Sequence, residues 1–140
     1  MKTPAKTVLG LMAAGLMLAA GASAPSATRL APAGIYVIDG DTIALPGGER
    51  VRFAGIAAPE MPSRAKCSRE ARLAVESRAH LQRLIREAKS VTLHRPPGER
   101  NRDRYGRLLR DVRADGHDLG RAMMAAGHAR PWTGRQPNWC

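Results

Sequence analysis

Acidic residues and cysteines are few in this chain of 140 residues. Aspartate and glutamate number 12 against 23 lysines and arginines, which leaves a formal net charge of +11. The two cysteines, Cys67 and Cys140, have no histidine at ligand spacing, so they do not suggest a metal site of their own. No internal repeat is present. If the N-terminal segment is a leader that is removed, about 110–120 residues remain, which suffices for one domain but not for two.

The excess of basic residues predicts an anionic partner. Arginine is far more frequent than lysine, and a guanidinium group can bind phosphate through two parallel hydrogen bonds. The same charge can also serve solubility or give weak affinity for an anionic membrane surface. The composition therefore favours DNA or RNA as the partner and leaves these two alternatives open.

Residues 1–22 have the pattern of a secretory signal peptide. Lys2 and Lys6 precede an apolar run over 8–20, and the small residues Ala20-Gly21-Ala22 predict cleavage after Ala22. The apolar run is shorter than the roughly 20 residues that span a bilayer. We therefore expect an exported protein, periplasmic or secreted. An uncleaved leader, which would tie the chain to the membrane, is the alternative.

The segment 23–32 is rich in alanine, serine and proline, and we interpret it as a linker before a domain over 33–140. In an exported protein an even number of cysteines suggests a disulfide, here Cys67–Cys140, with two free thiols as the alternative. Closing so long a loop stabilises a fold by roughly 4–5 kcal/mol on a chain-entropy estimate. Nothing in the sequence implies a protein partner, and we expect a monomer.

Hydrophobic patterning predicts a mainly β domain with helices, of the α+β class. A short helix is expected near the end of the chain, with Asp118 as its N-cap and Gly127 just after its last residue. Strands are expected over 34–38, 42–45, 50–56, 90–94 and 107–113, and a long helix over 69–88. Five short strands with a helix between the third and fourth suit a five-stranded OB-fold, a closed Greek-key barrel.

Three short motifs carry residues suited to phosphate chemistry. The first is Asp39-Gly40-Asp41-Thr42, in which two carboxylates flank a tight turn and suit a hard divalent cation. The second runs from Arg52 to Glu60, and the third is Asp103-Arg104-Tyr105-Gly106-Arg107. Taken singly, each motif is no more than a hairpin turn or a solvated charged loop.

In this order and over this element pattern, the three motifs resemble the staphylococcal nuclease (thermonuclease) family from about residue 34 to residue 130. The resemblance implies the OB-type barrel and a nuclease activity. It also implies that Asp41 is a carboxylate ligand of Ca²⁺ and that Arg52 and Arg107 grip the phosphate and its transition state. Glu60 matches the carboxylate that positions or deprotonates the attacking water.

One position departs from the family pattern. Where the family has an aspartate that is the second carboxylate on calcium, this chain has Ala57. The remaining ligands would be Asp41, the backbone carbonyl of Ala58, and water, with Asp39 as a possible substitute from the same turn. Because Ca²⁺ prefers six to eight oxygens, we expect calcium to be the cofactor but to bind more weakly.

Aromatic side chains close to arginine suggest further contacts with nucleic acid. By resemblance, Tyr105 lies beside the nucleotide phosphates and Arg104 is a neighbouring basic residue. Trp132, in an arginine-rich tail, can stack on a base or ribose. Trp139 has an alternative role in packing the tail against the domain.

These observations favour an exported nuclease that hydrolyses DNA, RNA or both, with little base specificity because its main contacts go to phosphate. The alternative, suggested by Ala57, is a catalytically impaired OB-fold module that binds single strands without cutting them. A basic adaptor for an acidic protein or envelope surface has no specific support in the sequence.

Overall fold

The computed structural model describes residues 27–140, together with residues 4, 10, 15 and 21 before them. The expected signal peptide and its cleavage site thus fall outside the continuously described part of the chain. Among the described residues, no helix is long and apolar enough to cross a membrane.

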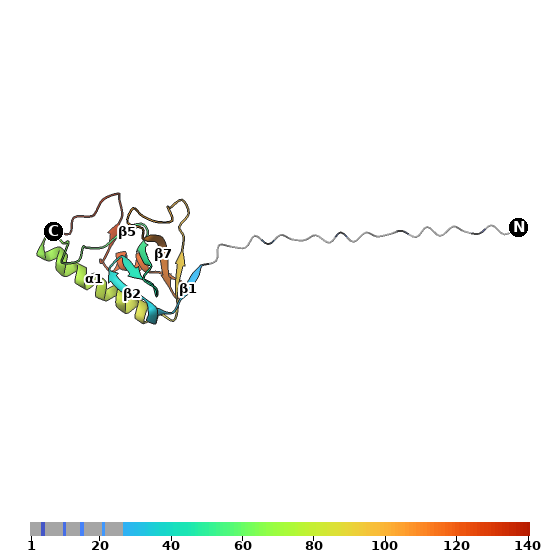
Figure 1. Ribbon diagram of the computed structural model, residues 1–140, viewed down its shortest axis with the longest axis horizontal. Coiled ribbons are helices and arrows are strands. Elements are labelled where there is room, and N and C mark those ends of the chain that lie inside the picture. The colour runs from blue at the N-terminus through green and yellow to red at the C-terminus, as the bar shows by residue number, and fades with distance from the viewer. Residues whose placement is uncertain (1–3, 5–9, 11–14, 16–20, 22–26) are drawn as a thin grey trace.

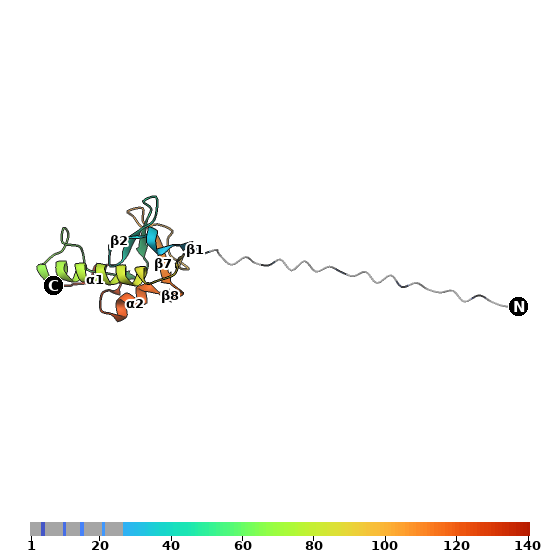
Figure 2. The ribbon, with the colours of Figure 1, turned by 90° about the horizontal axis from the view of Figure 1, so that it is seen from below.

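The described chain is a mixed α+β domain with two helices and a twisted sheet (Figures 1 and 2). Its helices are α1 (Ser68–Arg86), α2 (Leu119–Ala125) and the 3-10 turn η1 (Pro32–Gly34). Its strands are β1 (Thr28–Leu30), β2 (Tyr36–Asp39), β3 (Thr42–Ala44), β4 (Arg50–Phe53), β5 (Ile56–Ala57), β6 (Val91–His94), β7 (Leu108–Ala114), β8 (His117–Asp118) and β9 (Arg130–Pro131).

The main sheet has the strand order β1-β6-β7-β4-β3-β2, with β8 paired to β7, and β5 and β9 form a separate pair. Strands β2, β3 and β4 make the antiparallel meander expected from the sequence. The parallel pairing of β4 with β7 then brings the end of the meander beside the second half of the chain. This pairing places Arg52 next to Leu109, close to the loop that carries the third motif.

The closed barrel expected from the sequence is not observed, because no pairing joins β2 to β1 in the part of the chain that the structure describes. Helix α1 packs along β2 instead (Figure 1). There Arg78 Nε donates a hydrogen bond of 3.1 Å to the carbonyl of Val37 on β2. A side chain of the helix thus satisfies an edge carbonyl that barrel closure would otherwise pair with a strand.

Helix α1 is amphipathic. Ala74, Ser77, Leu81 and Ile85 recur every three or four residues and are buried. They face a core that includes Ile43, Phe53 and Met123, among other apolar side chains of the sheet and of α2. Cys67 is the N-cap, and its sulfur accepts the N–H of Glu70.

Two further expectations change at the edges of the domain. Thr28–Leu30 lies within the expected linker but forms β1 and pairs with β6, so the linker interpretation is wrong for these residues. The strand expected over 50–56 ends at Phe53, since the chain turns at Gly55 with a φ of 74° and continues as β5.

The predicted disulfide joins Cys67 to Cys140. It ties the C-terminus to the start of α1, and both ribbon views show the C-terminus beside that end of the helix (Figures 1 and 2).

Candidate functional site

A cleft of about 800 Å³ opens where the β2–β3 turn, β4, the segment after β5, the loop before β7 and the C-terminal tail converge. The loop and the tail rise on the same side of the sheet in Figure 1. The cleft lining contains every residue that the sequence singled out for a metal, catalytic or nucleic-acid role, namely Asp39, Asp41, Arg52, Ala58, Glu60, Arg104, Tyr105, Arg107 and Trp132. Residues from three separate motifs therefore share one surface.

Asp41 is a buried carboxylate of the cleft with several partners. Only 7% of it is exposed. Thr42 Oγ1 donates to its Oδ1 at 2.9 Å, and the N–H of Ala58 donates to its Oδ2 at 2.8 Å. The guanidinium of Arg52 lies 3.5 Å from the same Oδ2. These partners offset the cost of burying the charge.

Gly40 lets the acidic turn pack against the segment after β5. A Cβ at this position would lie 2.8 Å from the Cβ atoms of both Ala58 and Ser77. Glycine is therefore required here for the close approach of two segments. The sequence pattern Asp-Gly-Asp-Thr therefore forms a turn and also determines where the two carboxylates lie in the fold.

Asp39 forms a carboxylate pair with Asp41. The Asp39 Oδ1 accepts the N–H of Asp41 at 3.0 Å. Burial, together with the neighbouring Asp41 carboxylate, raises the pKa of Asp39 to about 7. Two buried carboxylates that repel one another in this way favour a bound proton or a bound cation.

Arg52 reaches the cleft from β4. Its Nη1 donates to the carbonyl of Phe53 at 2.7 Å, and its guanidinium carbon lies 5.8 Å from the ring centroid of Trp132. The side chain is held by a carboxylate, a carbonyl and an aromatic ring. Since a guanidinium carries five N–H donors, others remain for a ligand.

Arg107 is held by Asp103 at the opposite end of a tight loop. Its Nε donates to Asp103 Oδ2 at 2.7 Å, while Asp103 Oδ1 accepts the N–H groups of Tyr105 and Arg107. Burial acts to raise the pKa of Asp103, but the hydrogen bonds from Arg107 and Tyr105 outweigh it and hold the pKa below its usual value. The carboxylate therefore stays charged and keeps the guanidinium in place.

Tyr105 stands on this loop as an exposed aromatic surface, with 62% of its area accessible. The guanidinium groups of Arg104 and Arg107 lie 4.9 Å and 5.4 Å from its ring centroid. Arg104 Nη2 also donates to the Tyr105 hydroxyl at 2.7 Å. Trp132, 45% exposed, lies in the other wall of the cleft. A ligand lying in the cleft, such as a nucleic-acid strand, would meet an aromatic ring beside each of the two arginines Arg52 and Arg107.

Glu60 follows β5 and is partly exposed to the cleft. Its carboxylate pairs with Arg64 at 3.0 Å, and its backbone N–H donates to the buried Glu70 carboxylate at 3.2 Å. Neither Arg64 nor Glu70 stood out in the sequence as a site residue. Glu70 had a sequence signal, since a glutamate in the first turn of a helix is typical of helix capping.

The C-terminal tail forms the remaining wall. The N–H of Trp132 donates to Gly55 O, and Gln136 Nε2 donates to the carbonyl of Ala58 at 2.7 Å. Trp139 is buried, with the Arg130 guanidinium 4.2 Å from its ring centroid, so it packs the tail and does not line the cleft. Gln136 had no sequence signal, because its contact depends on a fold that joins residues far apart in the chain.

A family model described as staphylococcal nuclease homologue matches residues 50–138, more than half of the chain. The chain belongs to this family. The match includes Arg52, Glu60, Arg107 and Trp132, whereas the acidic turn with Asp41 precedes it. A search of curated proteins finds no match. Membership in the staphylococcal nuclease homologue family indicates a nuclease or a nucleic-acid-binding protein.

The family's calcium chemistry fits this cleft only in part. Asp39 and Asp41 are two buried carboxylates in the cleft lining whose mutual repulsion a hard divalent cation would relieve. The carbonyl of Ala58 already accepts a hydrogen bond from Gln136, and Ala57 is fully buried and brings no side-chain oxygen. Among the described residues no group of three or more His, Cys, Asp or Glu side chains could hold a metal ion. The donor set therefore suits a cation that takes most of its ligands from water or substrate.

Proposed function

We propose that this protein is an exported nuclease that hydrolyses phosphodiester bonds of DNA, RNA or both with little base specificity. The observation that carries the proposal is the convergence of Arg52, Arg107 and Glu60 on one cleft, each already held by a neighbouring side chain. The predicted signal peptide supports export, to the periplasm or the medium. The disulfide agrees with an oxidising compartment.

Arg52 and Arg107 suit the two sides of a phosphate. A phosphodiester gains negative charge on its oxygens as water attacks, and guanidinium forks placed in advance stabilise that charge without reorganising. Asp41 and Asp103 hold the two guanidinium groups through ion pairs. Most of the binding energy would come from phosphate contacts, which carry no sequence information.

Glu60 suits the role of general base. Its carboxylate takes a proton from the attacking water as the new P–O bond forms and the bond to the leaving oxygen breaks. The ion pair with Arg64 is partly exposed, so it can open when substrate enters. Tyr105 and Trp132 would stack on bases or sugars in the same cleft, which favours flexible single strands over a rigid duplex.

Asp39 and Asp41 are the residues that would hold calcium. A bound cation would neutralise charge on the phosphate and on the carboxylate pair. With Ala57 in place of a carboxylate, we expect the ion to bind weakly and with help from the substrate phosphate.

A second function, binding of single strands without cutting, is favoured by one observation. The Ala58 carbonyl, the backbone ligand expected for calcium, already accepts a hydrogen bond from the Gln136 side chain, and Ala57 provides no carboxylate. Either function uses the same cleft as a monomer. Contact with a membrane would arise only if the leader is retained.

The variant Glu60→Gln separates the two functions, because it removes the base and keeps the shape of the side chain. Cleavage of a labelled single-stranded oligonucleotide should fall at least about a hundredfold, while binding measured by fluorescence anisotropy stays within about twofold of the parent protein. Glu76→Gln is the matched control, since Glu76 lies on the exposed face of α1 outside the cleft lining. Equal cleavage by Glu60→Gln and the parent protein would remove Glu60 from the mechanism.

A further inference from the structure

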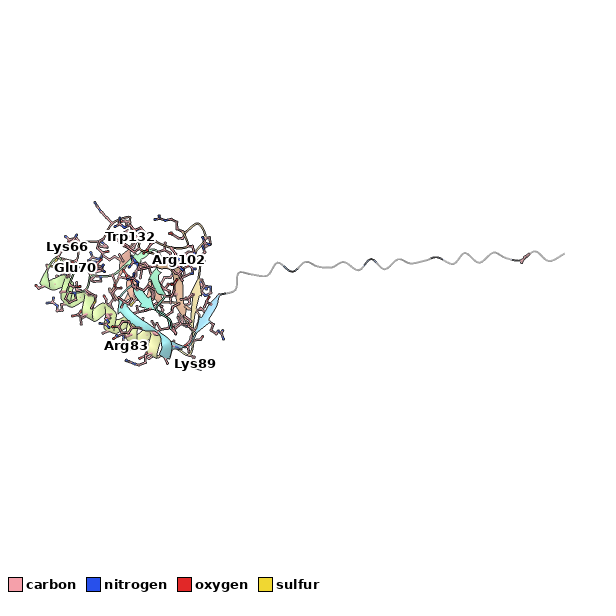
Figure 3. All side chains as sticks on the ribbon, in the orientation of Figure 1. Lys66, Glu70, Arg83, Lys89, Arg102 and Trp132 are labelled. Carbon is pink, nitrogen blue, oxygen red and sulfur yellow. A yellow bond between two sulfur atoms is a disulfide. The ribbon has the colours of Figure 1, made fainter. Side chains whose placement is uncertain are left out.

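A buried carboxylate lies just outside the cleft, on the first turn of α1. Glu70 is 1% exposed, and both of its oxygens accept backbone hydrogen bonds. Oε1 accepts the N–H of Glu60 at 3.2 Å, and Oε2 accepts the N–H of Lys66 at 2.7 Å. Figure 3 shows Lys66 and Glu70 beside one another at the start of α1. A charge buried this deeply is retained at a cost that such bonds offset.

The two bonds close the segment 60–66 onto a single side chain. Within that segment the N–H groups of Arg64 and Ala65 both donate to the carbonyl of Met61, at 2.8 Å and 3.0 Å. The resulting turn places Arg64 where it pairs with the Glu60 carboxylate. The backbone of Glu60 is therefore fixed by Glu70, and its carboxylate is directed by a residue of the same closed segment.

We propose that Glu70 is a positioning residue that holds Glu60 at the cleft, an inference that rests on the proposed role of Glu60. A general base acts only within hydrogen-bonding reach of the water that it deprotonates. A displacement of about 1 Å at such a group costs on the order of a hundredfold in rate. Glu70 itself does not line the cleft and touches no reacting atom.

The geometry requires a carboxylate and not an amide at this position. The Glu70 side chain meets two N–H donors, and only a carboxylate presents an acceptor to each. In Glu70→Gln one of the two N–H groups would face an NH₂ group, so one end of the segment would be released. The substitution keeps the size of the side chain, and the contact of the Glu70 N–H with Cys67 is unchanged in kind.

The chain supplies a matched control. Asp115, in the turn between β7 and β8, also accepts two backbone N–H groups with its carboxylate, those of Lys89 and Ser90. It does not line the cleft, and Lys89 lies beyond the opposite end of α1 from Glu70 (Figure 3). Asp115→Asn thus neutralises a carboxylate that accepts two backbone N–H groups, without touching the segment 60–66.

The test compares steady-state cleavage of a labelled single-stranded oligonucleotide by the parent protein, Glu70→Gln and Asp115→Asn. For Glu70→Gln we expect kcat to fall by about tenfold to a hundredfold with KM within about twofold, because Arg52 and Arg107, which would bind the phosphate, are unchanged. Asp115→Asn should change neither constant. The proposal would be overturned if Glu70→Gln and Asp115→Asn had the same kcat, or if Glu70→Gln raised KM and left kcat at the value of the parent protein. Should Glu70→Gln not fold, Glu70→Asp, which keeps the charge but is one methylene shorter, should show the same split.

Amide hydrogen exchange keeps this inference separate from the proposed nuclease activity. If the parent protein cuts no substrate, the proposed function fails, and the exchange rates still test whether Glu70 holds the segment. In Glu70→Gln the amides of Glu60 and Lys66 should exchange at least about tenfold faster, with the rest of α1 unchanged. Unchanged exchange at these two amides, or equal acceleration throughout the domain, would overturn the positioning role.

Discussion

At the scale of single residues, the two arginines proposed to bind phosphate, Arg52 and Arg107, are each paired with a carboxylate. Arg52 lies 3.5 Å from Asp41, and Arg107 lies 2.7 Å from Asp103. Such pairs fix the direction of a guanidinium before a ligand arrives, which lowers the entropy lost on binding. The residues of the three motifs could be predicted from the sequence, because motifs keep reactive residues at fixed spacing. The contacts of Glu70 and Gln136 with the site could not, because each acts through a backbone group that only the fold brings near; the sequence signal of Glu70 indicated the start of a helix and no more.

Ala57 gives a prediction about calcium at this scale. Ala57→Asp should lower the melting temperature in EDTA by roughly 5–15 °C, since it places an unpaired carboxylate at a fully buried position next to Ala58, whose N–H binds Asp41. Added calcium should restore much of this loss, because the cation would gain a ligand and neutralise the cluster. The measurement is thermal unfolding with and without calcium.

Ala57→Asn is the control for this variant, since it adds similar volume without charge. Its melting temperature should not respond to calcium more than that of the parent protein. An equal response to calcium in Ala57→Asp and Ala57→Asn would show that this position does not face the cation.

At the scale of elements, the loop before β7 is organised by one side chain. Asp103 accepts the N–H groups of Tyr105 and Arg107 as well as the Arg107 guanidinium. Gly106 permits the turn with a φ of 80°, a conformation that other residues rarely adopt. The charged sequence of this loop therefore forms a rigid support for Arg107.

This arrangement predicts how stability depends on pH. Because the pKa of Asp103 is lowered in the folded protein, its contribution is fully present above the unfolded value near 4 and is lost as the pH falls through the folded value. At pH 6 Asp103→Asn should be less stable than the parent protein by about 1–3 kcal/mol. Below about pH 4 the difference should shrink. Urea unfolding at several pH values measures it, and a pH-independent difference would contradict the role of the ionised carboxylate.

The sequence predicted the longer elements well and the short ones poorly. Both helices and the strands of the meander lie close to the ranges expected from hydrophobic periodicity. The short strands β1, β5, β8 and β9 carry too few residues for a period to show, and each exists because a partner strand lies beside it. The unpaired edge of β2 could not be predicted either, since the hydrogen bond that satisfies its Val37 carbonyl comes from Arg78 on α1, a residue far away in the sequence.

At the scale of the whole molecule, the disulfide contributes to the cleft as well as to stability. It joins residues 73 positions apart and fixes the tail that carries Trp132 and Gln136. The double variant Cys67→Ser/Cys140→Ser should lose roughly 2–5 kcal/mol of unfolding free energy. It should also bind oligonucleotide more weakly, because one wall of the cleft would be released. Urea unfolding and anisotropy measure the two effects. An unchanged unfolding midpoint would contradict the structural role, and unchanged binding would separate the tail from the cleft.

The measurement that bears most directly on the proposed activity is digestion of single-stranded DNA by the purified protein, with calcium titrated and EDTA as the control. We expect cutting that requires calcium at roughly 10⁻⁴–10⁻³ M, in keeping with a site that has lost a carboxylate, and that disappears in Glu60→Gln. No cutting at any calcium concentration, with salt-sensitive binding retained, would contradict the nuclease and leave a protein that holds nucleic acid without hydrolysing it.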